Sequence, residues 1–460
     1  MEPRRQWLER VGRGLSATAL VGLLAEESAG SPLDPLAPKA PHFPASADCV
    51  IFLYATGGVS HVDTFDFKPA LVADHGKKVT ASRWLNKPGA FERYLIKPRW
   101  AFRQYGQSGA WVSDLFPCLG ALADDLCILN AMHCDSDGHD KGTLAAHCGS
   151  AQFARPSHGA WVSYGLGTEN RNLPSFVVVA PAAPYAGAQT WGSDFLPGCH
   201  QGTHVLPGAE PLPNLVPRVA TPGVQRLELD LLARLNAAHA ERHPGADALA
   251  ARMEGYELAF RMQMEVPGIL DLSKEDAATR ELYGIGADAT DAFGRKCLLA
   301  RRLVERGVRF VQLYHGTWDS HDYIERAHGN LVRAVDRPIA ALIADLKRRG
   351  LLDSTLVVWC GEFGRTPDNG VRGGTAYGRD HNPKAMTIWL AGGGCKAGTT
   401  LGMTDDLGMA AVEGIAHVRD FHVTLLKLLG LDDNKLTYYH AGRFKQLSQF
   451  GGTAIKGLIA

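Results

Sequence analysis

Apolar residues along this chain form short β-rich runs separated by longer stretches with helical spacing. Six runs are short and almost entirely apolar, at residues 49–55, 126–132, 175–179, 308–314, 355–360 and 386–391. Strands covered on both faces have this character, because neither face meets water. With the helical patterns between them, these runs predict an α/β fold whose mainly parallel central sheet is sandwiched by helices.

Between residues 221 and 305 the pattern is helical. The segments LELDLLARLNAAHAERH, ALAARMEGYELAFRMQM and AFGRKCLLARRLVERG carry apolar residues three and four positions apart. We predict that about residues 221–305 form a helical insertion in a single domain at residues 46–460. The Gly/Pro-rich segment before it, residues 181–223, is expected to be an irregular surface loop at the rim of a site.

Residues 1–45 have the layout of an export signal followed by a linker. Arg4 and Arg5 precede a small apolar run at residues 15–25, and a Ser/Pro/Ala-rich stretch follows. That run is shorter than the roughly 20 residues that cross a bilayer, so we expect no stable membrane span. Paired arginines before Trp7 and Leu8 resemble a twin-arginine signal. We therefore expect export by the twin-arginine machinery to the periplasm or the medium; an N-terminal amphipathic helix is the alternative.

Charge and histidine content narrow the function. The 48 basic residues balance 48 acidic ones, so no overall field attracts nucleic acid, and none is expected as a partner. Eighteen histidines, several beside Asp and Gly, are typical of a metal or proton-transfer site. The nine cysteines form no CxxC pair, which argues against a zinc ribbon or thioredoxin chemistry.

Polar clusters follow four of the predicted strands. Open α/β sheets bind ligands at the carboxyl ends of their strands, so clusters far apart in sequence should converge there. Imidazole and carboxylate groups in such loops suit a divalent metal. The candidate metal ligands are His61, Asp63, Asp319, His321, Glu362, Asp380 and His381. For each cluster alone, loop or turn chemistry is the competing interpretation.

Other residues in these loops are candidates for catalysis. His139 could carry a proton or bind metal, and Lys141 and Arg365 could hold an anion. Thr143, Ser60 and Thr64 are candidate hydroxyl nucleophiles, while a metal-activated water needs none of them.

Long motifs resemble the domain-of-unknown-function 1501 family from about residue 48 to the C-terminus. They include GGVSHVDTFDFKP, DGHDKGT, CLLARRLVERGVRFVQLYHGTWDSHD, LVVWCGEFGRTP and GRDHNP. The resemblance implies an alkaline-phosphatase-like fold of the alkaline phosphatase and sulfatase superfamily. Proteins of that superfamily are metal-dependent hydrolases with ligands on strand-end loops and a nucleophile at a helix start.

The superfamily pattern is only partly present. Asp319, His321 and His381 look like metal ligands of the superfamily, and Glu362 looks like a replacement for an aspartate whose histidine neighbour is lost. The acidic tip of the first strand is glycine here, so His61 or Asp63 would have to substitute. The C/S-x-P-x-R motif of sulfatases does not occur, and the nucleophile's position falls near His139.

Three functions remain open. The first is an exported hydrolase that uses one or two divalent ions (zinc, calcium, magnesium or manganese) on a small-molecule or glycan ester of phosphate, sulfate or a related acid. The second is an exported binding protein with a sulfatase-like fold that has lost turnover and recognises an anionic glycan or a protein partner. The third is a purely structural exported protein.

Overall fold

The protein was analysed as a computed structural model that describes residues 35–80, 92–206, 222–242, 247–370 and 377–460. The predicted signal motif and its apolar run lie outside these residues. Of the predicted linker, the last part is in contact with the domain: the backbone N–H of Lys39 bonds to Leu166 O at 2.9 Å, and that of His42 to Gly430 O at 2.9 Å. No helix in the described residues is long and apolar enough to cross a membrane.

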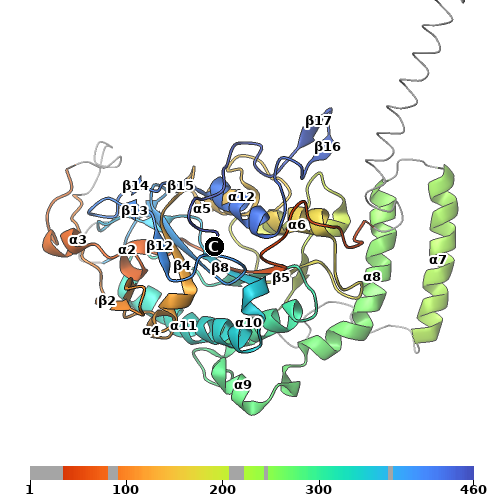
Figure 1. The fold of residues 1–460 in the computed structure, drawn as a ribbon, viewed down its shortest axis with the longest axis horizontal. Coiled ribbons are helices and arrows are strands. Elements are labelled where there is room, and N and C mark those ends of the chain that lie inside the picture. Colours follow the sequence, from red (N-terminus) through yellow and green to blue (C-terminus); the bar gives the residue numbers. More distant parts are fainter. Residues whose placement is uncertain (1–34, 81–91, 207–221, 243–246, 371–376) are drawn as a thin grey trace, which may run out of the picture.

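A mixed, mostly parallel sheet of nine strands forms the centre of the molecule, in the order β12-β4-β11-β8-β1-β7-β5-β6, with β15 paired to β4 (Figure 1). All six predicted apolar runs form strands of this sheet. The strands are β1 (Cys49–Ala55), β4 (Leu126–His133), β5 (Phe176–Val179), β6 (Thr203–Val205), β7 (Phe310–His315), β8 (Thr355–Cys360), β11 (Met386–Ala391), β12 (Thr399–Leu401) and β15 (Ala416–His417). The short strands β6, β12 and β15 were not predicted, because their runs are too brief to show a pattern.

Strand direction determines where the loops meet. β1 is parallel to β7 and β8, and β11 is antiparallel to β8 and β4. The carboxyl ends of β1, β4, β7 and β8 therefore lie at one edge of the sheet, beside the start of β11. The predicted fold class, a mainly parallel sheet between helices, is confirmed.

Helices cover both faces of the sheet. Along β1, Ile51 and Leu53 pack into one core and Phe52 and Tyr54 into the other, as the alternation of a strand requires. The first core is completed by α4 (Pro117–Gly120), α10 (Asp291–Val304) and α11 (Ile324–Arg348). The second is completed by α5 (His139–Cys148), α6 (His158–Leu166) and α12 (Val418–Leu428).

The predicted helical insertion contains helices of two kinds. α7 (Pro222–Arg242) and α8 (Asp247–Leu270) stand side by side at the margin of the molecule, and α9 (Ala277–Leu282) follows (Figure 1). α10, in contrast, packs directly on the sheet and is part of the sandwich.

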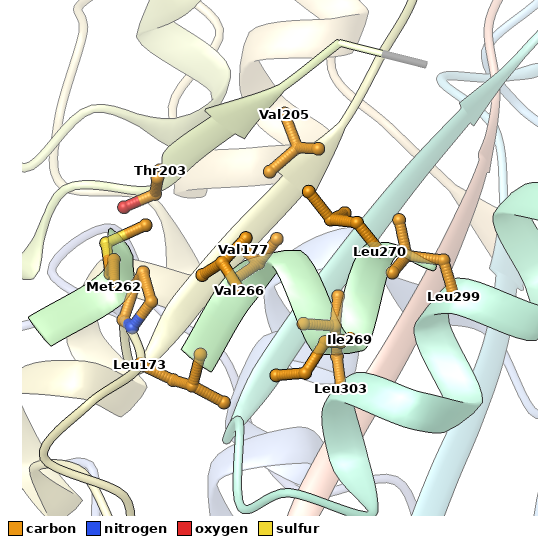
Figure 2. A pocket seen from close by; sticks show the side chains of 11 residues that line it. Leu173, Val177, Thr203, Val205, Met262, Val266, Ile269, Leu270, Leu299 and Leu303 are labelled. Carbon is orange, nitrogen blue, oxygen red and sulfur yellow. The ribbon is translucent and has the colours of Figure 1, made fainter. Parts of the chain in front are cut away.

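A narrow cavity lies between α8, α10, β5 and the edge strand β6 (Figure 2). Its lining is almost wholly apolar and has no titratable side chain: Leu173, Pro174, Val177, Thr203, Val205, Met262, Val266, Ile269, Leu270, Leu299 and Leu303. It is therefore a packing feature and offers nothing for bond cleavage.

The remaining elements are short and surround the sheet. They are α2 (His61–Thr64), α3 (Pro69–Ala73), β2 (Phe102–Tyr105), β3 (Ala110–Ser113), β9 (Gly364–Arg365), β10 (His381–Asn382), β13 (Met403–Thr404), β14 (Ala411–Glu413), β16 (Tyr438–His440) and β17 (Arg443–Lys445). β9 and β10 form an antiparallel pair that places His381 opposite Arg365. This pair carries a late histidine back to the strand ends.

Candidate metal centre

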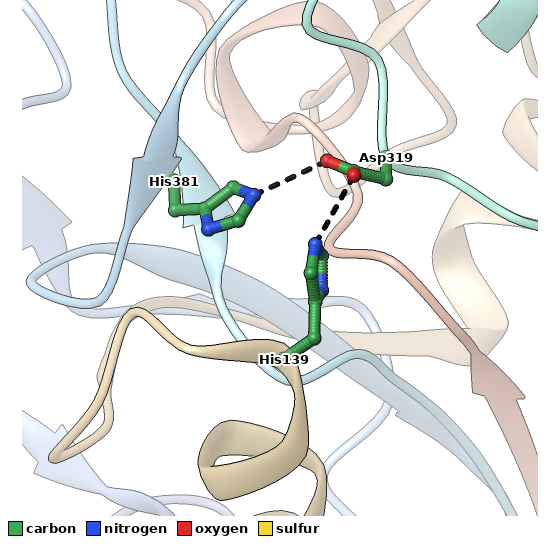
Figure 3. A group of neighbouring side chains, drawn as sticks. All are labelled: His139, Asp319 and His381. Atoms are coloured by element: carbon green, nitrogen blue, oxygen red, sulfur yellow. Dashed lines mark hydrogen bonds and ion pairs between the residues drawn. The ribbon is translucent and has the colours of Figure 1, made fainter. Parts of the chain in front are cut away.

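Three imidazole rings surround the carboxylate of Asp319, which lies four residues beyond β7. His321 Nε2 and His381 Nε2 lie 2.9 and 3.2 Å from Asp319 Oδ1, and His139 Nε2 lies 3.2 Å from Oδ2. Figure 3 shows His139 and His381 pointing at this carboxylate from separate elements. His139 begins α5 and His381 begins β10. The convergence expected from the sequence therefore occurs for Asp319, His321, His381 and His139.

Each of these rings has its second nitrogen near an acceptor. His139 Nδ1 lies 2.8 Å from Glu362 Oε1, and His381 Nδ1 lies 2.6 Å from the carbonyl oxygen of Asp137. His321 Nδ1 lies 3.6 Å from Asp380 Oδ1. Histidines that bind metal usually donate their second N–H to such an acceptor, which fixes the ring and its tautomer.

The donor set fits a divalent ion with a preference for nitrogen ligands. Two groups, His139–Asp319–His381 and His321–Asp380–His381, each bring three ligand atoms within 4.8 Å of one another. His139 Nε2 is buried and makes no hydrogen bond of normal geometry, although it lies close to Asp319. Imidazole with carboxylate suits zinc better than calcium or magnesium, which favour oxygen ligands alone.

The pKa values follow from the same contacts. Burial lowers the pKa of His139, but the neighbouring carboxylates of Asp319 and Glu362 outweigh this and raise the pKa to about 9. Burial raises the pKa of Asp319, yet the three histidines and Arg365 hold it well below its usual range. Burial also lowers the pKa of His381. The carboxylate is therefore ionised at neutral pH, as a metal ligand must be.

Glu362, a predicted ligand, contacts His139 on the side of the ring that faces away from Asp319. It is fully buried and its Oε1 accepts the Gly57 N–H at 2.7 Å in addition to contacting His139. Its Oε2 accepts a hydrogen bond from the Tyr54 hydroxyl at 3.1 Å. Glu362 therefore orients His139 and does not itself reach the open side of the site.

Arg365 was predicted to hold an anion, and the structure does not place it for that. The guanidinium is completely buried and donates to the carbonyls of Gly57, Gly58, Trp318 and Arg379 and to Asp319 Oδ1 at 2.7 Å. No part of the Arg365 side chain is exposed to solvent. Arg365 instead ties the loop after β1 to Asp319.

Asp380 connects the cluster to a second ion pair. Its Oδ1 accepts the backbone N–H of His381 at 2.9 Å, and its Oδ2 lies 3.1 Å from Arg93 Nη2. Arg93 also pairs with Asp368 at 3.0 Å. Asp380 therefore lies against His321 and belongs to the second group of candidate ligands.

His61 and Asp63, also predicted ligands, do not join the cluster. Asp63 is completely buried and accepts from Arg379 Nε at 2.6 Å and from Ser60 Oγ at 2.5 Å. Burial would raise the pKa of Asp63, but Arg379 and Ser60 lower it. His61 Nε2 lies 2.8 Å from the carbonyl oxygen of Gly408. The two side chains are engaged in holding loops together.

None of the predicted hydroxyl nucleophiles is open to a substrate. Thr143 is buried, and its hydroxyl oxygen lies 3.2 Å from that of Tyr54. Ser60 is bonded to Asp63, and the Thr64 hydroxyl donates to Ser60 O at 2.8 Å. Lys141 is solvent-exposed in the first turn of α5. The three predicted hydroxyl groups are therefore closed to a bound substrate.

Sequence reasoning missed Tyr185, which lies in the Gly/Pro-rich segment after β5. Its ring stacks on His139 with centroids 4.2 Å apart and planes 15° apart, and the side chain is 44% exposed. Burial raises the pKa of Tyr185, and the negative charges of Asp319 and Glu362 raise it further. A single tyrosine in an irregular loop has no sequence pattern that would identify it as a site residue. The only signal was the prediction that residues 181–223 form a loop at the rim of the site.

Gly57 is required by the close approach of two loops. Its φ of +115° is unfavourable for other residues, and a Cβ there would lie 2.5 Å from the backbone nitrogens of Trp318 and Asp319. The GG pair after β1 therefore lets the loop carrying Asp319 pack against β1, and this position determines where the carboxylate sits.

Solved structures similar to this chain include phosphatases and sulfatases. The alkaline phosphatase from the Antarctic bacterium TAB5 is 10% identical, with a TM-score of 0.36, and the match covers 84% of this chain and 99% of that one. The lipoteichoic acid synthase LtaP from Listeria monocytogenes is 10% identical (TM-score 0.38; 86% and 76% covered). The sulfatase PsFucS1 from Pseudoalteromonas sp. is 14% identical (TM-score 0.37; 85% and 69% covered).

No curated protein matches the chain. The family model described as "Protein of unknown function (DUF1501)" matches residues 47–459, almost the whole described domain. The chain therefore belongs to the DUF1501 family.

Proposed function

We propose that this protein is a metal-dependent hydrolase of phosphate, sulfate or related esters, in which Asp319, His139, His321 and His381 hold a divalent ion. The observation that carries the proposal is the convergence of three imidazole nitrogens on one carboxylate. Acceptors at the second nitrogen fix the rings of His139 and His381. The nitrogen-rich donor set favours zinc.

The metal and the residues around it would have different roles in hydrolysis. A divalent ion held by these residues would supply Lewis-acid polarisation of the ester and would lower the pKa of an attacking water. Glu362 and the Asp137 carbonyl fix the rings of His139 and His381. In hydrolysis the water oxygen bonds to phosphorus or sulfur, the bond to the ester oxygen breaks, and a proton passes to that leaving oxygen.

Tyr185 supports a substrate with a ring. One face of its aromatic ring is covered by His139, while much of the side chain is open to solvent. An exposed aromatic face beside the reacting group is a suitable surface for a sugar or another flat apolar face. The proposal therefore extends to glycan esters.

Metal content tests the assignment of the ligands. We expect the purified protein to contain about one equivalent of zinc and a His321→Ala/His381→Ala variant to contain none. His440→Ala, an exposed histidine of the β16–β17 hairpin, is the matched control and should retain the metal. A folded wild-type protein that takes up no zinc or manganese would contradict the assignment.

A binding protein without turnover is the second candidate. It is favoured by the complete burial of Arg365 and of the Thr143, Ser60 and Thr64 hydroxyls, which removes the expected anion clamp and covalent nucleophile. The two candidates separate in one experiment. A zinc-loaded protein that binds a sulfated or phosphorylated glycan but releases no phosphate or sulfate would support binding alone.

The N-terminal residues lead us to propose export. Arg4 and Arg5 before the apolar run support translocation by the twin-arginine machinery into the periplasm or beyond. An Arg4→Lys/Arg5→Lys variant should accumulate in the cytoplasm, whereas the wild-type chain should appear in the periplasmic or secreted fraction. Equal export of both chains would exclude the twin-arginine route.

A further inference from the structure

Helix α7 presents a row of apolar side chains to solvent. α7 packs beside α8 at the margin of the molecule (Figure 1). Val224, Leu227, Leu231 and Leu235 are 46, 69, 60 and 58% exposed, and Ala238 is exposed one turn further on. Isolated exposed leucines are common, but a contiguous row along one helix marks an interaction surface.

The row has a symmetric spacing. Val224, Leu227, Leu231, Leu235 and Ala238 are separated by three, four, four and three positions, so the pattern reads the same in both directions from Leu231. A second α7 lying antiparallel would place Leu231 beside its own copy. Leu227 would then meet Leu235 of the other copy, and Val224 would meet Ala238. Such self-complementarity is what a two-fold symmetric interface requires.

Charges beside the row fit the same arrangement. Asp230 and Arg234 lie one turn apart on one flank of the row, and the Asp230 side chain is 48% exposed although it also pairs with Arg226 at 2.6 Å. Antiparallel pairing about Leu231 reverses their order, so each Arg234 comes to lie beside the Asp230 of the other copy. A parallel arrangement would not bring these opposite charges together.

The charge balance of the helix favours protein over lipid. Its arginines equal its acidic residues in number: Arg226, Arg234 and Arg242 against Glu228, Asp230 and Glu241. A helix that lies on an anionic membrane is usually rich in Lys and Arg on its polar face. We propose that two copies of this chain associate through α7, packed antiparallel about a two-fold axis at Leu231.

Sedimentation velocity of the full chain over a range of concentrations tests this interface. The wild type should reach a dimer, and Leu231→Glu should raise the dissociation constant by at least about 100-fold, because two charges would be buried at the axis. Phe444→Glu, at a side chain 70% exposed in the β16–β17 hairpin, is the control and should leave it unchanged.

A charge reversal keeps the test independent of the apolar substitution. Arg234→Asp should weaken the dimer about 10-fold, because the new carboxylate lies beside Asp230 of the other copy, whereas Arg242→Asp at the end of the same helix should change it less than about 2-fold. Wild type that stays monomeric, or a dimer equally stable in Leu231→Glu, would overturn the proposal. Monomers that bind phosphatidylglycerol vesicles would reassign the row to a lipid surface.

Discussion

Two histidine and aspartate pairs look alike in the sequence and differ in the fold. His61 and Asp63 follow β1, Asp319 and His321 follow β7, and both pairs are separated by one residue. Both aspartates also contact a buried arginine. Arg379 uses Nε and Nη2 on both oxygens of Asp63, while Arg365 reaches only Oδ1 of Asp319.

The number of donors around each carboxylate decides its role. Asp63 receives further hydrogen bonds from Ser60 Oγ and Arg99 N, so its oxygens are saturated by fixed protein donors. Asp319 faces imidazole nitrogens, each of which can exchange a proton for a metal. A paired carboxylate stabilises the fold, and one ringed by histidines can bind an ion.

The largest expected effect is on stability at Asp63. Asp63→Asn should lower the free energy of unfolding by about 3–5 kcal/mol, because it leaves Arg379 buried without its counter-charge. The matched His321→Ala should change it by less than about 1 kcal/mol and should instead remove the metal. Urea denaturation with metal analysis of both variants measures the contrast. Metal loss in folded Asp63→Asn would place Asp63 in the metal site after all.

Glu362→Gln should act on metal affinity through His139. The amide can still fill the space but cannot accept from His139, Gly57 and Tyr54 with the same strength, so we expect zinc affinity to fall about 10–100-fold. Competition with a zinc chelator measures this. Asp368→Asn, which contacts Arg93 and not the rings, is the comparison; an equal loss there would mean that general loosening explains both.

His328 lies between the two pairs and should make the protein acid-sensitive. Its Nε2 accepts from Ser60 N at 3.3 Å, its Nδ1 lies 2.9 Å from Ser320 Oγ, and burial lowers its pKa to about 3. The pKa of His328 is lower in the folded protein than in the unfolded chain, so neutral His328 contributes fully to the free energy of unfolding above about pH 6.5. Below that pH the free energy of unfolding falls by about 1.4 kcal/mol per pH unit. Urea denaturation at pH 7 and 5 should show a smaller pH effect in His328→Asn; an unchanged slope would assign the loss to other buried histidines.

The smallest expected effect is at Tyr185. Tyr185→Ala should leave stability and metal content nearly unchanged and raise KM for a sugar ester several-fold, since an aromatic contact contributes about 0.5–1.5 kcal/mol. Tyr185→Phe should keep the low KM. Steady-state kinetics on a sugar ester and a small alkyl ester would show whether the effect requires a ring; an equal change for both substrates would argue against stacking.

Much of the fold could be predicted from the chain alone. Short runs of apolar residues without alternating polar positions predict strands that are covered on both faces. β1 and β8 begin and end at the residues predicted. The same reasoning placed Asp319, His321 and His139 at one edge of the sheet, because parallel strands finish at a common edge. His381 was added through its pairing with Asp380 and the family resemblance.

Only the tertiary structure decided which polar residues were left for chemistry. The sequence could not tell Asp63 from Asp319, because the partners of Asp63 include Arg379, which is 316 residues away. Likewise Arg365 and Glu362 are chemically suited to a substrate or a metal, yet contacts with Gly57 and Gly58 occupy them. Local patterns determine which segments pair into a sheet, whereas burial and the long-range donors around each charge determine which groups remain free to bind.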